Sequence, residues 1–465
     1  MITKTIPFTE DVFDLFMLFK EESHLFFLDS SLTASPNGRY SFIGFDPFEV
    51  FEGRNLADYQ RFKECFKNFV RQDTNPVMPF HSGAVGYLSY DLGLLFQGIV
   101  SLAASGSALP LFHFGFYDVI LAVDHLQQTL CITSTGFPEK TSLLQQARAK
   151  ERMDQILSRI RQLSPAPGRR SYDNARKLLP PPVFTSNVTR DEYIHNVHRA
   201  LEHIRQGDIY EVNLSHKILA DVAWETENLR PWEIYSCLRE LSPSHFSAYY
   251  HAGNHQLLST SPERFLSLKN GTAQIRPMKG TRPRGKTPEE DSLFRQELMH
   301  SPKEIAELLM VTDLERNDLG RVCDFGSVRV KEMRAIEEYK TVFQATSCIE
   351  GMLRKDKGCF DLLEACFPGG SVTGCPKISA MKIIDDIEKV KRGIYTGAFG
   401  YIDFSGNLDF NILIRTLLLS DKEISFHVGG GIVADSNSQL EYEETWLKAK
   451  AMMECLTVSP ARRSL

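Results

Sequence analysis

Four glutamates stand in two pairs whose spacing places each pair on one side of a helix. Glu304 and Glu307 are three residues apart in one predicted helix, and Glu441 and Glu444 are three apart in another. Carboxylate oxygens suit Mg²⁺, which commonly takes only one or two of them together with waters and an anionic substrate. Two such helix faces can meet around a magnesium ion, and the alternative is a solvated acidic surface.

One lysine stands in a run that holds its backbone on a restricted path. Lys279 lies in the segment 276–285, in which Pro277 and Pro283 limit the chain to extended or turn conformations. A lysine presented in this way can act as a nucleophile when its amine is neutral, which requires burial or nearby cations. A basic loop is the alternative interpretation.

Two glycine runs are candidates for binding an anion. The run 369–377 leads into a predicted helix, so its free N–H groups and the helix dipole favour a negative charge, with Thr373 and Lys377 as candidate substrate-binding residues. The run lacks the Gly-Lys-Ser/Thr ending of a Walker A loop. Gly429, Gly430 and Gly431 end a predicted strand, where backbone amides can approach a carboxylate.

An arginine interrupts an apolar run that predicts a strand. Arg415 lies within the predicted strand 410–419. A guanidinium there needs a carboxylate partner, which can come from a substrate bound in bidentate fashion or from a structural ion pair. From the residues alone, these patterns indicate an enzyme with a magnesium-assisted site for a small anion, and they leave the reaction open.

The composition limits the class of protein. The chain has 465 residues, of which 42% are hydrophobic and 24% charged, which is typical of a globular protein. The net charge of −6 gives no reason to expect a nucleic-acid partner. The nine cysteines are scattered without metal-binding spacing, so we expect reduced thiols. Without a signal sequence or an uninterrupted apolar span, we expect no membrane association and a cytoplasmic location.

The pattern of elements favours an α+β fold over a doubly wound sheet. Short apolar runs punctuated by Gly and Pro, such as 83–90 and 112–123, predict antiparallel strands up to about residue 137. We expect an N-terminal region 1–163, a linker 164–188 and a catalytic region 189–458. The helices and strands predicted from periodicity and punctuation are helices 140–163, 190–206, 288–319, 376–391 and 438–455, and strands 394–404, 410–419 and 424–428.

Seven segments taken together resemble the chorismate-utilising enzymes, the family of the anthranilate, aminodeoxychorismate, isochorismate and salicylate synthases. They occur in the family's order over about 190 residues, and an N-terminal likeness at 27–30 and 38–44 extends the resemblance to nearly the whole chain. The resemblance implies large antiparallel sheets packed as a β-sandwich core with helices outside. The seven segments are 261–265, 277–281, 307–320, 367–377, 395–401, 429–436 and 441–445.

The resemblance also implies roles for single residues. Glu307 and Glu444 match the glutamates that hold the ring carboxylate through Mg²⁺, with Glu441 nearby, and Glu263 matches an acid/base group that protonates the departing C4 hydroxyl. The residues that match substrate contacts are Arg415, Tyr395 and Gly429 to Gly431 for the enolpyruvyl carboxylate, and Gly280 and Thr281 near the ring.

Lys279 decides between branches of the family. The resemblance implies a nucleophile that attacks C2 and expels the C4 hydroxyl, after which ammonia attacks C4. Mg²⁺ and Arg415 are expected to keep the amine neutral. This favours 4-amino-4-deoxychorismate, the precursor of p-aminobenzoate and folate, as the product. The alternatives are anthranilate synthesis, in which Ala usually replaces Lys279, and a silent scaffold subunit.

Other positions depart from the family's pattern. Glu211 stands where aminating members usually have Gln and where isochorismate and salicylate synthases have a lysine base, so we expect no isochorismate activity. Gln344 stands where His is frequent. The tryptophan pocket of the family corresponds to Ser30, His245 and Phe246, and because His245 replaces a proline we expect a vestigial site. No glutaminase motif occurs, so the resemblance implies a separate glutamine amidotransferase subunit as a heterodimer partner.

Overall fold

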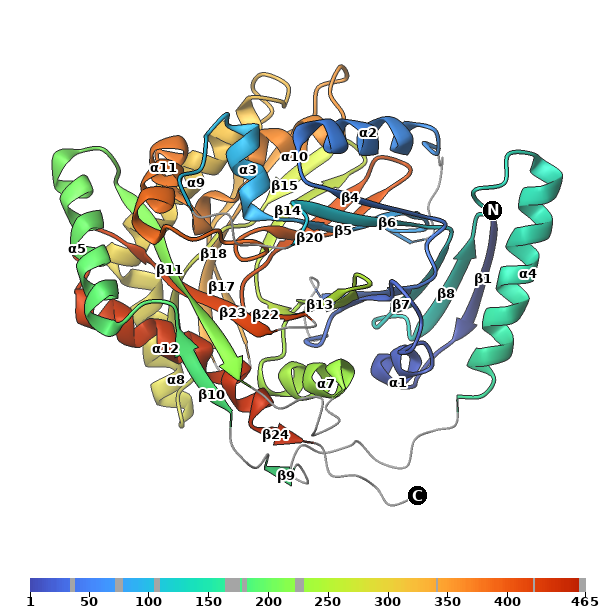
Figure 1. The fold of residues 1–465 in the computed structure, drawn as a ribbon, viewed down its shortest axis with the longest axis horizontal. Coiled ribbons are helices and arrows are strands. Elements are labelled where there is room, and N and C mark those ends of the chain that lie inside the picture. The colour runs from blue at the N-terminus through green and yellow to red at the C-terminus, as the bar shows by residue number, and fades with distance from the viewer. Residues whose placement is uncertain are drawn as a thin grey trace.

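The fold is built from two broad antiparallel sheets with helices on their outer sides (Figure 1). The computed structural model describes residues 1–33, 38–71, 78–103, 109–163, 176–177, 182–221, 230–339, 342–420 and 423–459. The α+β class expected from the sequence is confirmed. Strands alternate side chains between their two faces, so each sheet presents one apolar face to the other sheet and one to the helices.

The first sheet crosses the molecule from the N-terminal strand to the catalytic region. Its order is β1 (Ile2–Pro7), β8 (Thr129–Ser134), β7 (Val119–Asp124), β3 (Tyr40–Gly44), β2 (Phe26–Asp29), β12 (Phe246–His251), β13 (His255–Ser261), β22 (Thr416–Ser420), β23 (Ile424–Ile432), β11 (Glu211–Asp221) and β10 (Val183–Ser186), with β19 (Gly374–Cys375) joined to β11.

The second sheet also draws strands from both regions. Its order is β16 (Met278–Pro283), β18 (Val342–Met352), β15 (Thr272–Ile275), β14 (Arg264–Lys269), β21 (Leu408–Ile412), β20 (Ala398–Asp403), β5 (Gly83–Leu88), β6 (Phe112–Tyr117) and β4 (Glu49–Gly53), with β17 (Arg329–Glu338) paired to β18. A small third sheet pairs β9 (Arg176–Lys177) with β24 (Val458–Ser459).

The region boundaries expected from the sequence do not correspond to separate sheets. Strands from 1–163 and strands from 189–458 lie side by side in both large sheets, for example β2 beside β12 and β5 beside β20. Most of the proposed linker 164–188 lies outside the described residues. The two regions are therefore hydrogen-bonded to each other through one strand pair in each large sheet.

The core between the sheets is aromatic. Phe26 and Phe42 of the first sheet and Tyr87 and Phe399 of the second belong to one buried cluster. A second cluster lies between the first sheet and helices including α1, α4, α7 and α12, and a third lies between the second sheet and α2, α9 and α10. This layering confirms the sandwich implied by the resemblance.

The helices begin and end largely at residues that cap them. The predicted helix 190–206 is confirmed as α5, where the Thr189 and Glu192 side chains form a capping box and Gly207 ends the helix at φ 82°. The helices are α1 (Val12–Met17), α2 (Leu56–Lys67), α3 (Tyr90–Phe96), α4 (Ser142–Ile160), α5 (Arg190–Gln206), α7 (Pro231–Leu241), α8 (Pro288–His300), α9 (Pro302–Gly320), α10 (Cys359–Cys366), α11 (Lys377–Glu388) and α12 (Ser438–Leu456).

Two single elements expected from the sequence are each divided. The predicted helix 288–319 is wrong as one helix, because Ser301 caps α9 and Pro302 has no N–H with which to continue α8. The predicted strand 410–419 is wrong as one strand, because β21 lies in the second sheet and β22 in the first. Arg415 stands between them with φ 50°, so the chain changes sheets there.

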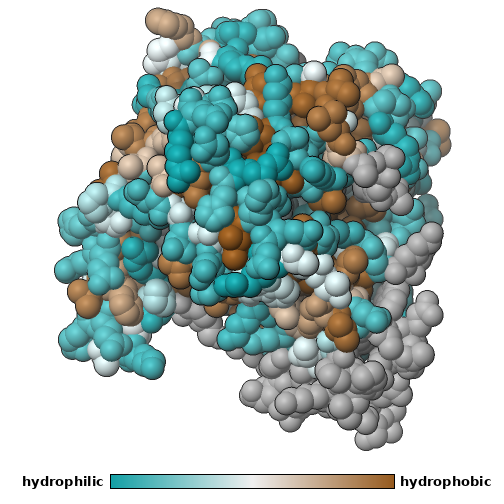
Figure 2. Space-filling model, turned by 60° about the vertical axis from the view of Figure 1, so that its left-hand side comes forward, coloured by the Kyte–Doolittle hydropathy of each residue, from teal (hydrophilic) through white to brown (hydrophobic). Residues whose placement is uncertain are grey.

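Among the described residues, no helix combines the length and the apolar character needed to cross a membrane. Figure 2 shows one face of the molecule, on which hydrophilic residues predominate and apolar residues lie between them in small groups.

Candidate active site

Lys279 is held at a meeting point of the two sheets. It lies on β16, whose pairing with β18 shifts register between Lys279 and Thr281. Its Nζ forms an ion pair with Oε1 of Glu211, which lies on β11 of the other sheet, and the two side chains are 12% and 2% exposed. The second oxygen of Glu211, Oε2, is buried without a hydrogen-bond partner among the described residues.

The Lys279 amine is protonated in this arrangement. Burial lowers the pKa of Lys279, but the carboxylates of Glu211, Glu307 and Glu263 outweigh it and leave the pKa above its usual value. The expectation that Mg²⁺ and Arg415 keep the amine neutral stays a prediction, and the direct contact with Glu211 acts against it. A nucleophilic Lys279 needs a proton acceptor.

Glycines make room for this pair. A Cβ atom at Gly431 of β23 would lie 2.5 Å from Glu211 Oε1 and 3.1 Å from Lys279 Nζ. A Cβ atom at Gly430 would point elsewhere, 3.3 Å from Glu441 Oε2 and 3.7 Å from Lys448 Nζ of α12. The two glycines thus leave room on different sides of β23: Gly431 for the lysine–glutamate pair, and Gly430 for the side chains of α12.

Along one edge of the same glycine run, the backbone N–H and C=O groups are not paired with another described strand. β22 pairs with β23 only at Ile424 and Ser425, so over Gly429–Gly431 this edge of β23 has no strand partner in the described part of the chain. Lys448 Nζ donates to the Gly429 carbonyl at 3.0 Å. The arrangement agrees with the expectation that backbone amides are available to a ligand, which stays a prediction.

Glu263 is a buried carboxyl group that retains its proton near neutral pH. It lies between β13 and β14, is 5% exposed, and its Oε1 accepts from Ser371 Oγ at 2.6 Å and from the Met278 N–H at 3.3 Å. Burial raises its pKa to about 7, although Ser371 and Lys279 act in the opposite direction. Such a group can donate a proton at neutral pH and recover it afterwards.

The acidic faces of α9 and α12 are close enough to the lysine to influence its charge. Lys279 lowers the pKa of Glu307 on α9, although burial is the larger effect and leaves that pKa raised. Lys279 also acts on Glu444 of α12, whose pKa is raised by burial but lies below its usual value because of Lys448 and other lysines. Burial raises the pKa of Glu441. The two helix faces predicted from the sequence therefore share one electrostatic environment.

The donors on these helices fit magnesium chemically. Lys303 Nζ lies 3.8 Å from Glu307 Oε1, and Lys448 Nζ lies 2.8 Å from Glu444 Oε1, so amines now neutralise the carboxylates that a cation would contact. No group of three ligating side chains is assembled in the described part of the chain. Glu307 and Glu444 each supply carboxylate oxygens, the ligands that Mg²⁺ takes in small number together with water and an anionic substrate.

Arg415 offers a partly buried cation to a ligand. Burial lowers the pKa of Arg415, with Tyr339 acting against it. Its backbone carbonyl accepts from Thr260, but within the described residues its guanidinium has neither an ion pair nor a hydrogen bond. The structural ion pair considered as the alternative is therefore not formed there. The ring of Tyr395 stacks on the ring of His427 of β23, with 5.2 Å between the ring centroids. Burial raises the pKa of Tyr395 to about 12.

The glycine loop before α11 already binds carboxylates of the protein. The Gly370 N–H donates to Glu315 at 2.7 Å, and Ser371 donates to Glu263. Thr373 is fully buried and its hydroxyl donates to the Gly369 carbonyl. Lys377 forms an ion pair with Asp318 and donates to the Cys366 carbonyl at 2.8 Å.

Among the described residues, Lys377 makes no contact with Lys279. It lines a different hollow, of about 630 Å³, between α9 and α11. The role assigned to Thr373 and Lys377 in substrate binding stays a prediction. In the structure the loop holds two glutamate side chains in position: its Gly370 amide binds Glu315, and its Ser371 hydroxyl binds Glu263.

Gly280 and Thr281 flank the lysine on its strand. Gly280 has φ 82°, and a Cβ atom there would lie 2.6 Å from Glu304 Oε2, so the position requires glycine. Thr281 is exposed and pairs with Gln344 of β18, whose Oε1 is buried without a partner in the described structure. Their contacts with a substrate ring are not tested by these observations.

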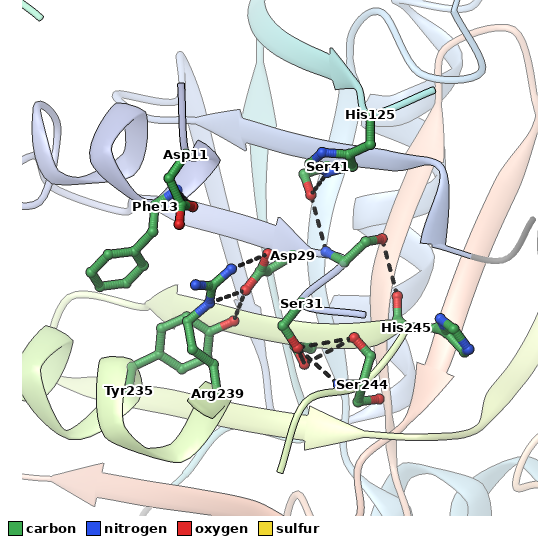
Figure 3. A network of polar contacts seen from close by, with 12 residues as sticks. Asp11, Phe13, Asp29, Ser31, Ser41, His125, Tyr235, Arg239, Ser244 and His245 are labelled. Atoms are coloured by element: carbon green, nitrogen blue, oxygen red, sulfur yellow. Dashed lines mark hydrogen bonds and ion pairs between the residues drawn. The ribbon is translucent and has the colours of Figure 1, made fainter. Parts of the chain in front are cut away.

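Two of the residues matched to a tryptophan site, Ser30 and His245, belong to a network of polar contacts. Figure 3 shows this network with His245 labelled. Ser30 Oγ donates to the Tyr40 carbonyl at 2.7 Å and to the His245 carbonyl at 3.2 Å. Nearby, Asp29 accepts from Tyr235 and Arg239, as Figure 3 shows. Ser30, His245 and Phe246 line a cavity of about 540 Å³. Whether this cavity is vestigial stays a prediction.

Sequence analysis did not identify three supporting contacts of the site. It gave no role to Ser371 or Glu315, and it named Glu211 only as a departure from a family pattern. Ser371 and Glu263 are 108 residues apart, and Glu211 and Lys279 are 68 apart, so no local spacing could indicate these pairs. Glu315 and Ser371 lie within the family's motifs 307–320 and 367–377, and Glu211 stands at a position that departs from the family's pattern, so only the resemblance could have drawn attention to them.

Comparisons with known proteins agree with this geometry. A family model described as chorismate binding enzyme matches residues 29–454. The chain is 36% identical to anthranilate synthase component 1 of Acetivibrio thermocellus, covering 97% of this chain and 95% of that protein. It is 34% identical to aminodeoxychorismate synthase component 1 of Bacillus subtilis strain 168, covering 98% and 97%. A crystal structure of anthranilate synthase component I from Streptococcus pneumoniae TIGR4 is similar with a TM-score of 0.78 and 29% identity, covering 91% of this chain and 93% of that one.

Proposed function

The chain belongs to the family of chorismate binding enzymes, and from this premise we propose that it aminates chorismate at C4 to give 4-amino-4-deoxychorismate. The observation that carries the proposal is the position of Lys279, buried beside Glu211 and within the electrostatic reach of Glu307 and Glu263. Relatives of both aminating kinds are similarly close, so this residue supplies the choice between C4 and C2 amination.

The proposed reaction uses Lys279 as a temporary nucleophile. Its neutral amine attacks C2 of the ring, the ring double bonds shift, and the C4–O bond breaks. Ammonia then attacks C4, the double bonds shift back, and the C2–N bond breaks to release the lysine. The enolpyruvyl ether remains intact, which distinguishes this product from anthranilate.

Glu263 is proposed to protonate the departing hydroxyl. Hydroxide is a poor leaving group, so the C4–O bond breaks readily only if a proton arrives at the oxygen. A pKa of about 7 leaves roughly half of the Glu263 carboxyl groups protonated at neutral pH. The Ser371 hydroxyl, which donates to Oε1 at 2.6 Å, holds the carboxyl group in one orientation.

The two carboxylates of the substrate are proposed to bind at opposite sides of the lysine. Glu307 and Glu444, with Glu441 nearby, are proposed to hold Mg²⁺, which when bound neutralises the ring carboxylate. Arg415, Tyr395 and the amides of Gly429, Gly430 and Gly431 are proposed to bind the enolpyruvyl carboxylate. The guanidinium of Arg415 supports this assignment, because a partly buried cation that no described residue pairs with favours an anionic ligand.

Ammonia is proposed to come from a separate glutamine amidotransferase subunit. The relatives are named component 1, which supports a second component. The product would serve the synthesis of p-aminobenzoate and folate. In vitro, a high concentration of ammonium should replace the partner.

The test is to incubate the protein with chorismate, Mg²⁺ and ammonium and to identify the product by liquid chromatography and mass spectrometry. We expect 4-amino-4-deoxychorismate without release of pyruvate, and its loss in Lys279→Ala. Anthranilate together with pyruvate would support the alternative, C2 amination. Tight binding of chorismate without turnover, even with a glutaminase present, would support a silent scaffold subunit.

A further inference from the structure

We infer that Glu211 is the proton acceptor that turns the Lys279 ammonium group into a nucleophilic amine. The inference rests on the proposed function, because it explains how that nucleophile is generated. Glu211 acts through Lys279 rather than on the substrate itself.

The first support is direct contact between two buried groups. Glu211 Oε1 and Lys279 Nζ are ion-paired, and their side chains are 2% and 12% exposed. A proton can pass between atoms in hydrogen-bond contact without entering water. Glu211 Oε2 is buried without a hydrogen-bond partner among the described residues, so the carboxylate is less stabilised than one that is fully hydrogen-bonded.

The second support is that neighbouring carboxylates are otherwise engaged. Glu263 Oε1 accepts from Ser371 and from the Met278 N–H, and this group is needed as an acid rather than a base. Glu307 faces Lys303 at 3.8 Å. In the described part of the chain, Glu211 is the carboxylate in ion-pair contact with Lys279.

The third support is that the backbone around the pair leaves room for the Glu211 and Lys279 side chains to stay in contact. Gly431 leaves the space that a Cβ atom would take from both Glu211 and Lys279. Gly280 adopts φ 82° beside the register shift of β16, which turns the strand next to the lysine. Two glycine positions, one on β23 and one on β16, thus agree in bringing these two side chains together.

The proton transfer balances within the pair. The ammonium group of Lys279 gives one proton to the Glu211 carboxylate, leaving an amine and a carboxylic acid. The amine attacks C2 and the C4 hydroxyl leaves as water with the proton of Glu263. When ammonia has attacked C4 and the C2–N bond breaks, the released amine regains its proton from Glu211. The new C4 ammonium group returns one proton to Glu263, so the net change is chorismate plus ammonia to 4-amino-4-deoxychorismate plus water.

This mechanism has a distinctive dependence on pH. Transfer within the pair changes no net number of bound protons, so activation of Lys279 does not depend on pH in the neutral range. In Glu211→Gln, Glu263 and Glu307 still favour the ammonium form, and its proton must be lost to solvent. The reactive fraction then rises about tenfold per pH unit below the pKa of the lysine.

The experiment measures the rate at which full-length enzyme with Mg²⁺ and chorismate, but no ammonia, forms the Lys279 adduct. Rates are followed by rapid quenching and intact-protein mass spectrometry between about pH 6 and 8. We expect Glu211→Gln to be about 100-fold slower than the wild type at pH 7, and the wild-type-to-variant ratio to fall about tenfold per pH unit. Because Glu263 titrates in both enzymes, its effect cancels in the ratio.

Controls separate proton transfer from a structural role. Glu350→Gln removes another buried carboxylate paired with a lysine, Lys331 at 3.0 Å, and should leave the rate unchanged. A wild-type-to-variant ratio that does not change with pH would overturn the inference, even if Glu211→Gln were slow. If the wild type turns over without accumulating adduct, the same ratio is measured on initial rates at one fixed concentration of free NH₃.

The inference and the proposed function fail in different ways. Absence of both the adduct and 4-amino-4-deoxychorismate in the wild type would refute the proposed function. An adduct that forms equally fast in wild type and Glu211→Gln at every pH would refute only the role of Glu211.

Discussion

Replacing Glu263 with Gln should make the protein more stable at alkaline pH while removing its activity. The Glu263 carboxyl is 5% exposed, and burial raises its pKa from 4.5 to about 7. Gln has nearly the same shape and can still accept from Ser371 and the Met278 N–H, but it neither ionises nor donates a proton to a leaving group.

The sign of the stability effect follows from proton binding in the two states. Between pH 4.5 and about 7 the folded protein holds a proton on Glu263 that the unfolded chain has released, so stability falls as the pH rises through this range. The shift of about 2.5 units corresponds to about 3 kcal/mol at roughly 1.4 kcal/mol per unit. The Glu263→Gln variant has no carboxyl group at this position and does not carry this loss.

The assay is denaturant unfolding of wild type and Glu263→Gln at about pH 5 and pH 8. We expect the stability of the variant relative to the wild type to rise by about 2.5 kcal/mol between these conditions, because roughly 1 kcal/mol of the loss is already present at pH 5. The kcat should fall by about 10² or more, because the departing hydroxyl loses its acid. Glu350→Gln is a control, since the pKa of Glu350, raised by burial but lowered more by Lys331 and Gln274, is below its usual value. Its proton linkage therefore lies below about pH 5, and the relative stability of this variant should hardly change between the two conditions.

Two results would refute the reasoning. A stability difference that is the same at both pH values would mean that the Glu263 carboxyl is not destabilised by ionisation in the fold. Full activity in Glu263→Gln would mean that another group, or water, protonates the hydroxyl. The second result would leave the stability argument intact.

Three other changes test separate parts of the site. Glu444→Gln should raise the Mg²⁺ concentration needed for half-maximal rate more than tenfold with little change in the melting temperature; an unchanged requirement would show that the carboxylate is surface decoration. Arg415→Lys should raise the KM for chorismate about tenfold or more in steady-state assays, because one point charge replaces a bidentate donor, and an unaltered KM would exclude a contact with the substrate. Gly431→Ala should lower kcat, since its Cβ would lie 2.5 Å from Glu211 Oε1 and 3.1 Å from Lys279 Nζ; wild-type kcat would show that the pair need not stay in contact.

Much of the local structure was predictable because its causes lie within a few residues. The helix 190–206 has its capping box at Thr189 and its terminating glycine at Gly207, so its bounds follow from nearby side chains. The glutamate pairs on α9 and α12 follow from helical spacing in the same way. Ser301 and Pro302, which divide the predicted helix 288–319, are local signals as well, since Ser301 caps α9 and Pro302 stands in its first turn.

The sequence by itself determined the candidates for the chemistry: the acidic helix faces, the constrained lysine, the arginine within an apolar run and the glycine runs, together with the motifs that place the chain in its family. The tertiary structure alone decided their relations. It turned one apolar run into two strands of different sheets with Arg415 at the crossing, and it set Glu211 against Lys279 and Ser371 against Glu263. Helical periodicity and caps act over a few residues, whereas these contacts are set by strand register and sheet packing across 68 and 108 residues of chain, which no local pattern encodes.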